Sequence, residues 1–340
     1  MIPPTFIPRA IFPQLEGIPR TYFLGHHKAG LDQMKKMISM IDLVIECRDY
    51  RIPATSINPM LDEALGEKTR YIVYTKRDLG GSMKLKYQKI DKQITKWDRP
   101  TKVFFTSPNR NTMYPILDAL KKERYPCNPV VGARVLVVGM PNIGKSSLIN
   151  ALRFVGRKKG KAARIGADPG VTRKVGGPIK ILHRERNPVY IVDTPGVFVP
   201  YMPDSESMLK LALCSCIKNT IISRITLADY LLYQYNRQNA ELYAKISPPT
   251  NDIMEFLEAL ARKRSFLAKG GVPDIDTAAS RFLGLWRNGL LGTLILDDVD
   301  AETLKRKEAK FAELGMSMNQ AKKAQKEERK KLQLAKLEKV

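Results

Sequence analysis

Apolar residues recur every three or four positions in some stretches of the chain and form short unbroken runs in others. The helical face predicted for residues 28–40 carries Leu31, Met34, Met37, Ile38 and Ile41. Short apolar runs predict buried strands at 42–47, 71–74, 103–105, 134–138 and 189–192. Between the strands, the same periodicity predicts helices at 58–66, 82–98 and 112–123. This alternation predicts an α/β domain with parallel strand pairing and helices on both faces of the sheet.

The pattern changes at both ends of this domain. The first twenty residues contain five prolines, which predicts an extended arm; a cleavable targeting segment is an alternative, although the helix and serines typical of one are missing. After Pro200 the helical pattern dominates, with helices expected at 206–218, 227–236 and 251–268. We therefore expect an arm, an α/β domain, a helical domain that binds RNA or the ribosome, and a long, weakly anchored basic helix, at 1–24, 25–200, 201–300 and 301–340.

A phosphate-binding loop follows directly on the strand predicted at 134–138. Residues 139–146 read G-M-P-N-I-G-K-S and lead into an apolar helix. Glycines at the two ends let backbone N–H groups turn toward phosphates, the lysine places an ammonium on the outer phosphates, and the serine hydroxyl can ligate Mg²⁺. The candidate phosphate contacts are Asn142, Ile143, Gly144, Lys145, Ser146 and Ser147.

A second motif, D-T-P-G, ends the strand predicted at 189–192. Asp193 can hold Mg²⁺ through water, and the Gly196 N–H can reach the γ-phosphate, so both contacts would be lost on hydrolysis. Between the two motifs, Thr172 is the candidate Mg²⁺ ligand of a switch loop.

Guanine recognition normally uses N-K-x-D, and the chain offers Thr75-Lys76-Arg77-Asp78 instead, before the phosphate-binding loop. The Asp78 carboxylate can accept from guanine N1–H and N2, and the Lys76 stem can cover the base. Thr75 replaces the usual asparagine, but its hydroxyl could still tie this loop to the phosphate-binding loop. Ser107 marks a second candidate base-contacting loop. The order of these motifs is a circular permutation of the ordinary GTP-binding domain.

The sequence resembles the circularly permuted GTPases of ribosome assembly, of the YlqF/YawG type, over residues 20–300. Besides the loops above, the resemblance rests on Gly25-His26, Asp49-Tyr50-Arg51-Ile52-Pro53, Asn58-Pro59, Ala228-Asp229-Tyr230-Leu231-Leu232, Lys269-Gly270-Gly271, Asp276 and Arg287-Asn288-Gly289-Leu290-Leu291-Gly292. It implies a three-layer P-loop fold with a helical C-terminal domain. It implies hydrolysis of GTP to GDP and phosphate by a factor that docks on rRNA in the GTP state and leaves after hydrolysis. It also implies action as a monomer on rRNA and proteins of the large ribosomal subunit. The mitochondrial member is the most similar, which implies a matrix location with peripheral contact to the inner membrane; a cytoplasmic location is the alternative.

The catalytic group is expected outside the D-x-x-G motif, because Val197 follows it and cannot polarise water. The resemblance assigns this role to His26, but His27 occupies the next position of the family pattern and leaves open which histidine acts. Asn142 matches GTPases in which K⁺ supplies positive charge beside the phosphates, which implies K⁺ stimulation.

The charge of the chain points to a polyanionic partner. Lys and Arg exceed Asp and Glu by 58 − 34, a net charge of +24. Residues 151–186 carry eleven basic residues against two acids, and 301–340 carries twelve against six. We expect rRNA phosphate contacts from Arg157, Lys158, Lys159, Lys161 and Arg164.

The four cysteines are too few for a disulfide scaffold and predict buried or free thiols in a reducing compartment. No apolar run reaches the length of a membrane-spanning helix. Two other functions remain open: a GTP-gated placeholder in which hydrolysis is incidental, and a membrane-associated regulatory GTPase that does not act on ribosomes.

Overall fold

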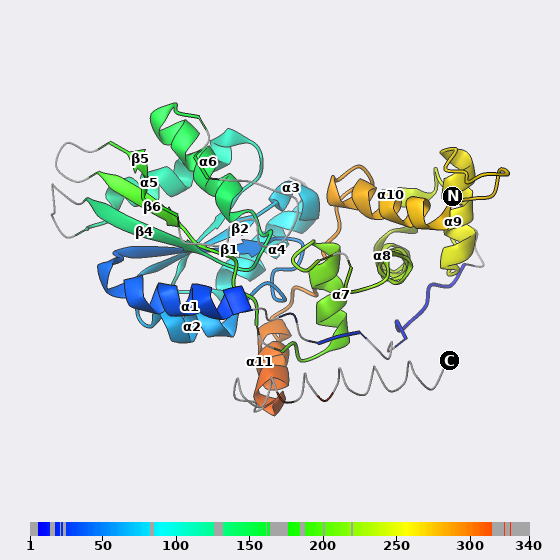
Figure 1. Cartoon of the computed structure of the whole chain (residues 1–340), viewed down its shortest axis with the longest axis horizontal. Helices are drawn as coiled ribbons and strands as arrows, with labels where there is room; N and C mark the ends of the chain where they lie inside the picture. The colour runs from blue at the N-terminus through cyan, green and yellow to red at the C-terminus, as the bar shows by residue number, and fades with distance from the viewer. Residues whose placement is uncertain are drawn as a thin grey trace.

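The fold consists of an α/β part and a group of helices beside it (Figure 1). A computed structural model of the full chain describes residues 6–13, 18–20, 22, 25–81, 85–125, 132–160, 162–163, 176–183, 188–199, 201–218, 220–314, 323 and 327, with the side chains of 25, 26, 85, 86, 313 and 314 excepted.

One sheet organises the α/β part. Its strands are β1 (Leu43–Asp49), β2 (Arg70–Thr75), β3 (Lys102–Phe105), β4 (Ala133–Val138), β5 (Ile179–Leu182) and β6 (Val189–Asp193). They lie in the order β3-β2-β1-β4-β6-β5, and neighbours from β3 to β6 pair in parallel. The predicted parallel sheet is therefore confirmed for these strands.

β5 departs from the prediction. It was not expected from the sequence, and it pairs antiparallel with β6 at the edge of the sheet. The strand has four residues, and Lys180 interrupts its apolar pattern. An edge strand tolerates such a charge because one side of it faces solvent.

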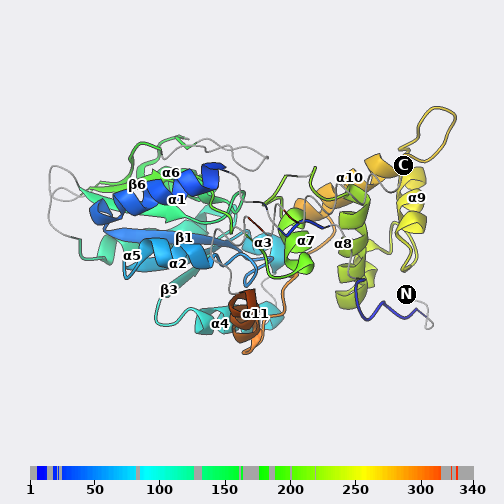
Figure 2. The same ribbon diagram turned by 60° about the horizontal axis from the view of Figure 1, so that its bottom comes forward.

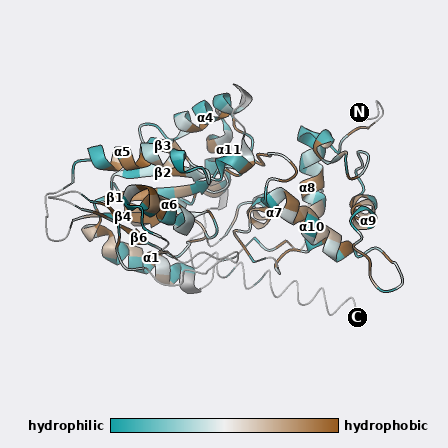
Figure 3. Cartoon of the chain, turned by 90° about the horizontal axis from the view of Figure 1, so that it is seen from above, coloured by the Kyte–Doolittle hydropathy of each residue, from teal (hydrophilic) through white to brown (hydrophobic). Residues whose placement is uncertain are grey.

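Helices cover both faces of the sheet and make the predicted three layers, which are confirmed. They are α1 (Gly25–Met37), α2 (Pro59–Leu65), α3 (Arg77–Gly80), α4 (Leu85–Trp97), α5 (Tyr114–Lys122) and α6 (Lys145–Arg157), with 3₁₀ turns at Ile38–Met40 and Arg110–Met113. α1 and α2 pack Leu31, Met34 and Leu61 against Val44 and Leu136. The opposite face packs Ile45, Val135 and Ile191 with apolar residues of α5 and α6. In Figure 3, hydrophobic residues concentrate on the strands and on the helix faces turned toward them.

The second part is helical, as predicted. It contains α7 (Ser205–Leu213), α8 (Arg224–Gln238), a 3₁₀ turn (Ala240–Tyr243), α9 (Ile253–Lys263) and α10 (Ile275–Arg287). Its core includes the fully buried rings of Tyr235, Phe256, Phe282 and Trp286. Among the described residues after 200, the only strand-like pairing is an isolated bridge between Leu267 and Pro273.

The N-terminal arm lies along the helical part. Residues 6–13 have no regular secondary structure, as predicted. Arg9 forms an ion pair of 2.5 Å with Asp229 of α8, and the Phe12 ring packs edge-on against Tyr230 at 5.1 Å. These residues of the arm therefore form part of the folded domain.

The chain returns to the α/β part after α10, on the side where α4 lies (Figure 2). Asp297 accepts from the Thr55 N–H and hydroxyl, both at 2.7 Å, and the Trp97 indole N–H donates to the Asp300 carbonyl at 2.9 Å. α11 (Thr303–Leu314) follows, and its Lys307 ammonium donates to the carbonyls of Ala54 and Ile57. In the described part of the segment expected to be a long, weakly anchored basic helix at 301–340, Thr303–Leu314 is helical and a mostly buried lysine anchors it. The expectation of weak anchoring is therefore wrong for this part, and the helix length beyond 314 stays a prediction. Of the residues beyond it, the structure describes 323 and 327.

The described cysteines Cys47, Cys214 and Cys216 are free and buried, as predicted for these side chains; Cys127 lies outside the described residues. Burial raises the pKa of Cys47 to about 12 and that of Cys216 to about 11. No helix in the described ranges has the length and apolar character required to cross a bilayer.

The buried ammonium of Lys307 predicts a pH dependence of stability. Burial lowers the pKa of Lys307 to about 7, so between about pH 7 and its ordinary value near 10.4 the unfolded chain binds a proton that the folded chain does not. Stability should rise with pH in this window, and by about 1.4 kcal/mol per pH unit at most. We expect the unfolding free energy of the wild type, measured in urea at pH 7 and pH 9, to rise relative to that of Lys307→Met. Equal changes in both proteins would contradict this interpretation.

Candidate nucleotide-binding site

The predicted nucleotide loops gather at one edge of the sheet. β4, β1 and β2 are adjacent and parallel, and their carboxyl ends lead into the phosphate-binding loop, Asp49 and Thr75. β6 ends at Asp193, and Ser107 follows β3. Ligands of open parallel sheets bind at this edge. The structure therefore brings together the motifs that lie far apart in the chain.

The phosphate-binding loop forms a cradle between β4 and α6. Gly139 has φ 142°, and a Cβ there would lie 2.5 Å from the Cys47 carbonyl, so a side chain would clash with the neighbouring strand. The Lys145 ammonium donates to the carbonyls of Met140 at 2.8 Å and Gly139 at 3.2 Å. α6 begins at Lys145, which directs the N-terminal N–H groups of this helix into the same loop.

The two described candidate Mg²⁺ ligands are in contact. The Ser146 hydroxyl donates to Asp193 Oδ2 at 2.8 Å. Asp193 Oδ1 is buried and has no hydrogen-bond partner in the described part of the chain, and burial raises the pKa of this carboxyl. A cation at this point would satisfy the oxygen and stabilise the carboxylate. The pair therefore fits Mg²⁺; the third candidate, Thr172, lies outside the described residues.

The D-x-x-G motif packs directly against the phosphate-binding loop. A Cβ on Gly196 would lie 2.5 Å from the Pro141 nitrogen, so only glycine fits between these backbones. The Val197 N–H donates to the Gly139 carbonyl at 3.2 Å, and the Val197 side chain is fully buried among apolar residues. Val197 therefore cannot orient water, as the sequence analysis expected.

His27, near the start of α1, lies on the same motif. Its side chain is 1% exposed, and its Nδ1 lies 2.9 Å from the Gly196 carbonyl oxygen. The ring packs beside Tyr22 and Phe198. The backbone of His26 belongs to α1, and its side chain lies outside the described part of the structure. The sequence did not predict this contact between His27 and the D-x-x-G motif.

The candidate guanine loop is tied to the phosphate-binding loop at two points. The Thr75 hydroxyl donates to the Ile143 carbonyl, which confirms that threonine can brace this loop in place of asparagine. The Lys76 ammonium donates to the Asn142 carbonyl at 2.7 Å. Asp78 is exposed in the first turn of α3. Ser107 is half-buried, and its hydroxyl accepts from the Asn109 N–H at 3.2 Å.

Asp49 is a further residue of this edge whose place the sequence analysis did not assign. It ends β1 and is fully buried, and Oδ2 accepts from Lys76 at 2.9 Å and from Arg51 at 2.8 Å. The sequence feature that could have identified Asp49 is a carboxylate at the end of a buried strand, next to the strand that carries the base-recognition motif.

The basic residues predicted to bind RNA lie at the far end of α6. Arg157 ends this helix, and Lys158 and Lys159 are exposed after it. Twelve residues at 1.5 Å each separate Arg157 from Lys145, or about 18 Å. Asn150 holds the following backbone back against α6, since its side-chain oxygen accepts from the N–H groups of 162 and 163, each at 2.9 Å. Lys161 and Arg164 lie outside the described residues.

Comparison with known proteins places this site in a family. Residues 134–268 match a family described as 50S ribosome-binding GTPase. Mitochondrial GTPase 1 of Schizosaccharomyces pombe is 35% identical over 305 residues, covering 84% of this chain and 92% of that protein. Mitochondrial ribosome-associated GTPase 1 of Bos taurus is 36% identical over 296 residues, covering 81% and 88%. The crystal structure of GNP-bound YlqF from T. maritima matches with a TM-score of 0.52 and 26% identity, covering 79% of this chain and 97% of that one.

The similarity extends over most of the chain, and the permuted loops meet at one edge of the sheet as a GTP site requires. The chain therefore belongs to the family of circularly permuted GTPases that includes mitochondrial GTPase 1, and it hydrolyses GTP.

Proposed function

We propose that this GTPase assists assembly of the large ribosomal subunit in the mitochondrial matrix, docking on rRNA with GTP bound and leaving after hydrolysis. The names of its relatives support the mitochondrial and ribosomal setting. The observation that carries the proposal is the position of the D-x-x-G motif. Gly196 lies on the phosphate-binding loop, and α7 of the helical part begins at Ser205, nine residues later. Because so few residues separate Gly196 from α7, a movement of Gly196 on loss of the γ-phosphate can be passed along the chain to the helical part.

Each predicted site residue has a proposed role. Asp78 reads the guanine edge, Lys76 covers the base, and Thr75 and Ser107 shape the base pocket. The phosphate-binding residues hold the phosphates; these are Asn142, Ile143, Gly144, Lys145, Ser146 and Ser147 with the Gly196 N–H. Ser146, Asp193 and Thr172 hold Mg²⁺, which neutralises charge on the phosphates. K⁺ at Asn142 would add positive charge there.

Water activation is assigned to His26. The buried His27 ring is instead a support for the Gly196 backbone, because its Nδ1 lies 2.9 Å from that carbonyl. The rRNA contact is assigned to the end of α6, where Lys158 and Lys159 are exposed about 18 Å from the phosphate-binding lysine. Phosphate contacts at this distance can hold RNA without touching the nucleotide.

Guanine recognition is tested by Asp78→Asn. The amide places an N–H donor opposite the guanine N2 amine, which is itself a donor, whereas xanthine has a carbonyl acceptor at that position. GTP affinity should therefore fall by at least about tenfold, and xanthosine triphosphate should bind better than GTP. Titration with fluorescent analogues of GTP, ATP and xanthosine triphosphate measures both changes. A wild type that binds ATP as tightly as GTP would overturn the assignment.

The roles of the two histidines are distinguished by replacing each of them with alanine. His26→Ala should keep GTP affinity and thermal stability and lose ribosome-stimulated turnover by about 10²–10⁴. His27→Ala should lower the unfolding free energy by about 1–3 kcal/mol, because it leaves a buried carbonyl and a cavity. Turnover and urea unfolding are measured on both variants. Full turnover of His26→Ala would remove His26 from catalysis.

The rRNA contact is tested through salt. Replacing Arg157, Lys158, Lys159 and Lys161 by Ser removes up to four phosphate contacts, so the log–log salt slope of binding to large subunits should flatten by about three. The matched control replaces Lys89, Lys92, Lys121 and Lys122, which are exposed on α4 and α5. Wild-type binding should be tighter with a non-hydrolysable GTP analogue than with GDP. An unchanged slope, or equal binding in both nucleotide states, would contradict the docking cycle.

A further inference from the structure

The Asp49 carboxylate is buried between two cations at the carboxyl end of β1. Arg51 donates to it through Nε at 3.0 Å and through a terminal nitrogen at 2.8 Å, which makes a bidentate pair. Lys76 donates to the same carboxylate at 2.9 Å. These two cations hold the pKa of Asp49 well below its usual range. Asp49 is therefore charged and fixed by partners on either side.

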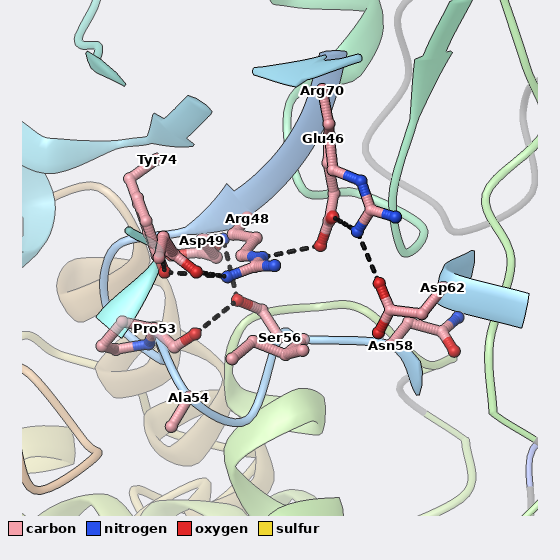
Figure 4. Close-up of polar contacts among 12 residues, drawn as sticks. Glu46, Arg48, Asp49, Pro53, Ala54, Ser56, Asn58, Asp62, Arg70 and Tyr74 are labelled. Carbon is pink, nitrogen blue, oxygen red and sulfur yellow. Dashed lines mark hydrogen bonds and ion pairs between the residues drawn. The ribbon is translucent and has the colours of Figure 1, made fainter. Parts of the chain in front are cut away.

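The neighbouring residues of β1 fix the strand end from its other face (Figure 4). Arg48 donates to Glu46 at 2.6 Å and to the Tyr74 hydroxyl at 3.2 Å, and Glu46 pairs with Arg70 at 2.9 Å. The Asp49 N–H donates to the Ser56 hydroxyl at 3.2 Å. The Asp49 backbone cannot shift without breaking this buried network.

Lys76 links Asp49 to the phosphate-binding loop. Its ammonium lies 2.9 Å from Asp49 Oδ2 and 2.7 Å from the Asn142 carbonyl. The backbone of Lys76 has φ 57°, a left-handed conformation that is unfavourable for a lysine and persists only where surrounding contacts impose it. Asp49 supplies such a contact, since it holds the far end of the same side chain.

Arg51 links Asp49 to the helical part. Its guanidinium lies 4.9 Å from the centre of the Trp286 ring, and Trp286 is buried in α10. The next residue, Arg287, donates to the carbonyls of Leu213 and Ala212 at the end of α7. From that end, the Ser215 carbonyl accepts from the Asn142 side chain at 2.9 Å. The helical part thus contacts the phosphate-binding loop through Ser215, and it contacts Arg51, which pairs with the same carboxylate, Asp49, as Lys76 does.

We propose that Asp49 and Arg51 position Lys76 against the phosphate-binding loop, and that Trp286 makes this position depend on the helical domain. Displacement of the helical domain, as by a docking partner, would loosen Lys76 and speed release of guanine nucleotide. This proposal rests on the proposed role of Lys76 in covering the base. It gives the helical domain control over nucleotide exchange in addition to any contact with RNA.

The dissociation rate of a fluorescent GDP from the full-length protein, chased with unlabelled GDP, tests the proposal. Arg51→Met and Trp286→Leu should each speed dissociation by about 3- to 30-fold. Trp286→Leu leaves the Asp49–Arg51 pair intact and keeps an apolar side chain in the core. Arg51→Lys should restore part of the effect, because it keeps a cation beside Asp49 without the bidentate geometry. Circular dichroism establishes that each variant is folded at the temperature used.

Arg9→Met is the matched control. Arg9 also pairs with an aspartate, Asp229, and lies 5.8 Å from the centre of an aromatic ring, Tyr233, but it does so in the N-terminal arm. Its loss should leave the GDP dissociation rate unchanged.

A double-mutant cycle separates positioning from a general loss of structure. If Arg51 acts through Lys76, the Arg51→Met change should alter the rate less than about twofold in a Lys76→Met background. Full multiplication of the two effects, or a wild-type rate in Trp286→Leu, would overturn the proposal. If the wild type binds GDP no better than Lys145→Ala does, the assignment of the nucleotide-binding residues is overturned. If GDP binds well but Arg51→Met and Lys76→Met change the dissociation rate independently, only the positioning of Lys76 by Arg51 is overturned.

Discussion

The parallel pairing of β1 with β2 on one side and β4 on the other is the constraint on which the rest of the site depends. It places Asp49, Thr75 and the phosphate-binding loop at one edge, although β4 follows β2 by almost sixty residues in the chain. Sheet hydrogen bonds depend on which strands are neighbours and on their register, and the order of the strands in the chain does not enter. A permuted sequence can therefore rebuild the same site, with the Thr75 hydroxyl and the Lys76 ammonium closing the contact between its two halves.

The sequence predicted the parts whose chemistry is local. The glycines and lysine of the phosphate-binding loop, the Ser146 and Asp193 pair and the bracing hydroxyl of Thr75 all follow from short motifs at strand ends. β5 was not predicted from the sequence because its four residues, interrupted by a lysine, show little hydrophobic periodicity. α10 was not singled out, although Asp274 caps its first turn and Ala278, Phe282 and Trp286 recur on one face. The position of His27 depends on Gly196, far along the chain, and that of Asp49 depends on Lys76 at the end of the neighbouring strand; no local pattern encodes either contact.

The charge of the molecule is distributed unevenly between interior and surface. The interior near the site holds Glu46, Arg48 and Asp49, each almost fully buried and each in an ion pair. A buried pair gains little over an apolar pair in net stability, but breaking it is costly, so such a network favours one arrangement of the strand end. The surplus of +24 therefore lies in groups outside these balanced pairs, where it is available to an anionic partner.

The loop after β1 receives some of its contacts from the last part of the chain. Thr55 is held by Asp297, and the carbonyls of Ala54 and Ile57 are held by Lys307, about 250 residues further on. During synthesis, or during threading through any translocation pore, the early strands exist before these partners have emerged. The α/β domain therefore cannot complete this surface one segment at a time from its N-terminus. The loop after β1 obtains its last contacts only when α11 has been synthesised. A chain truncated before Asp297 would leave the carbonyls of Ala54 and Ile57 without Lys307, and Thr55 without its carboxylate acceptor.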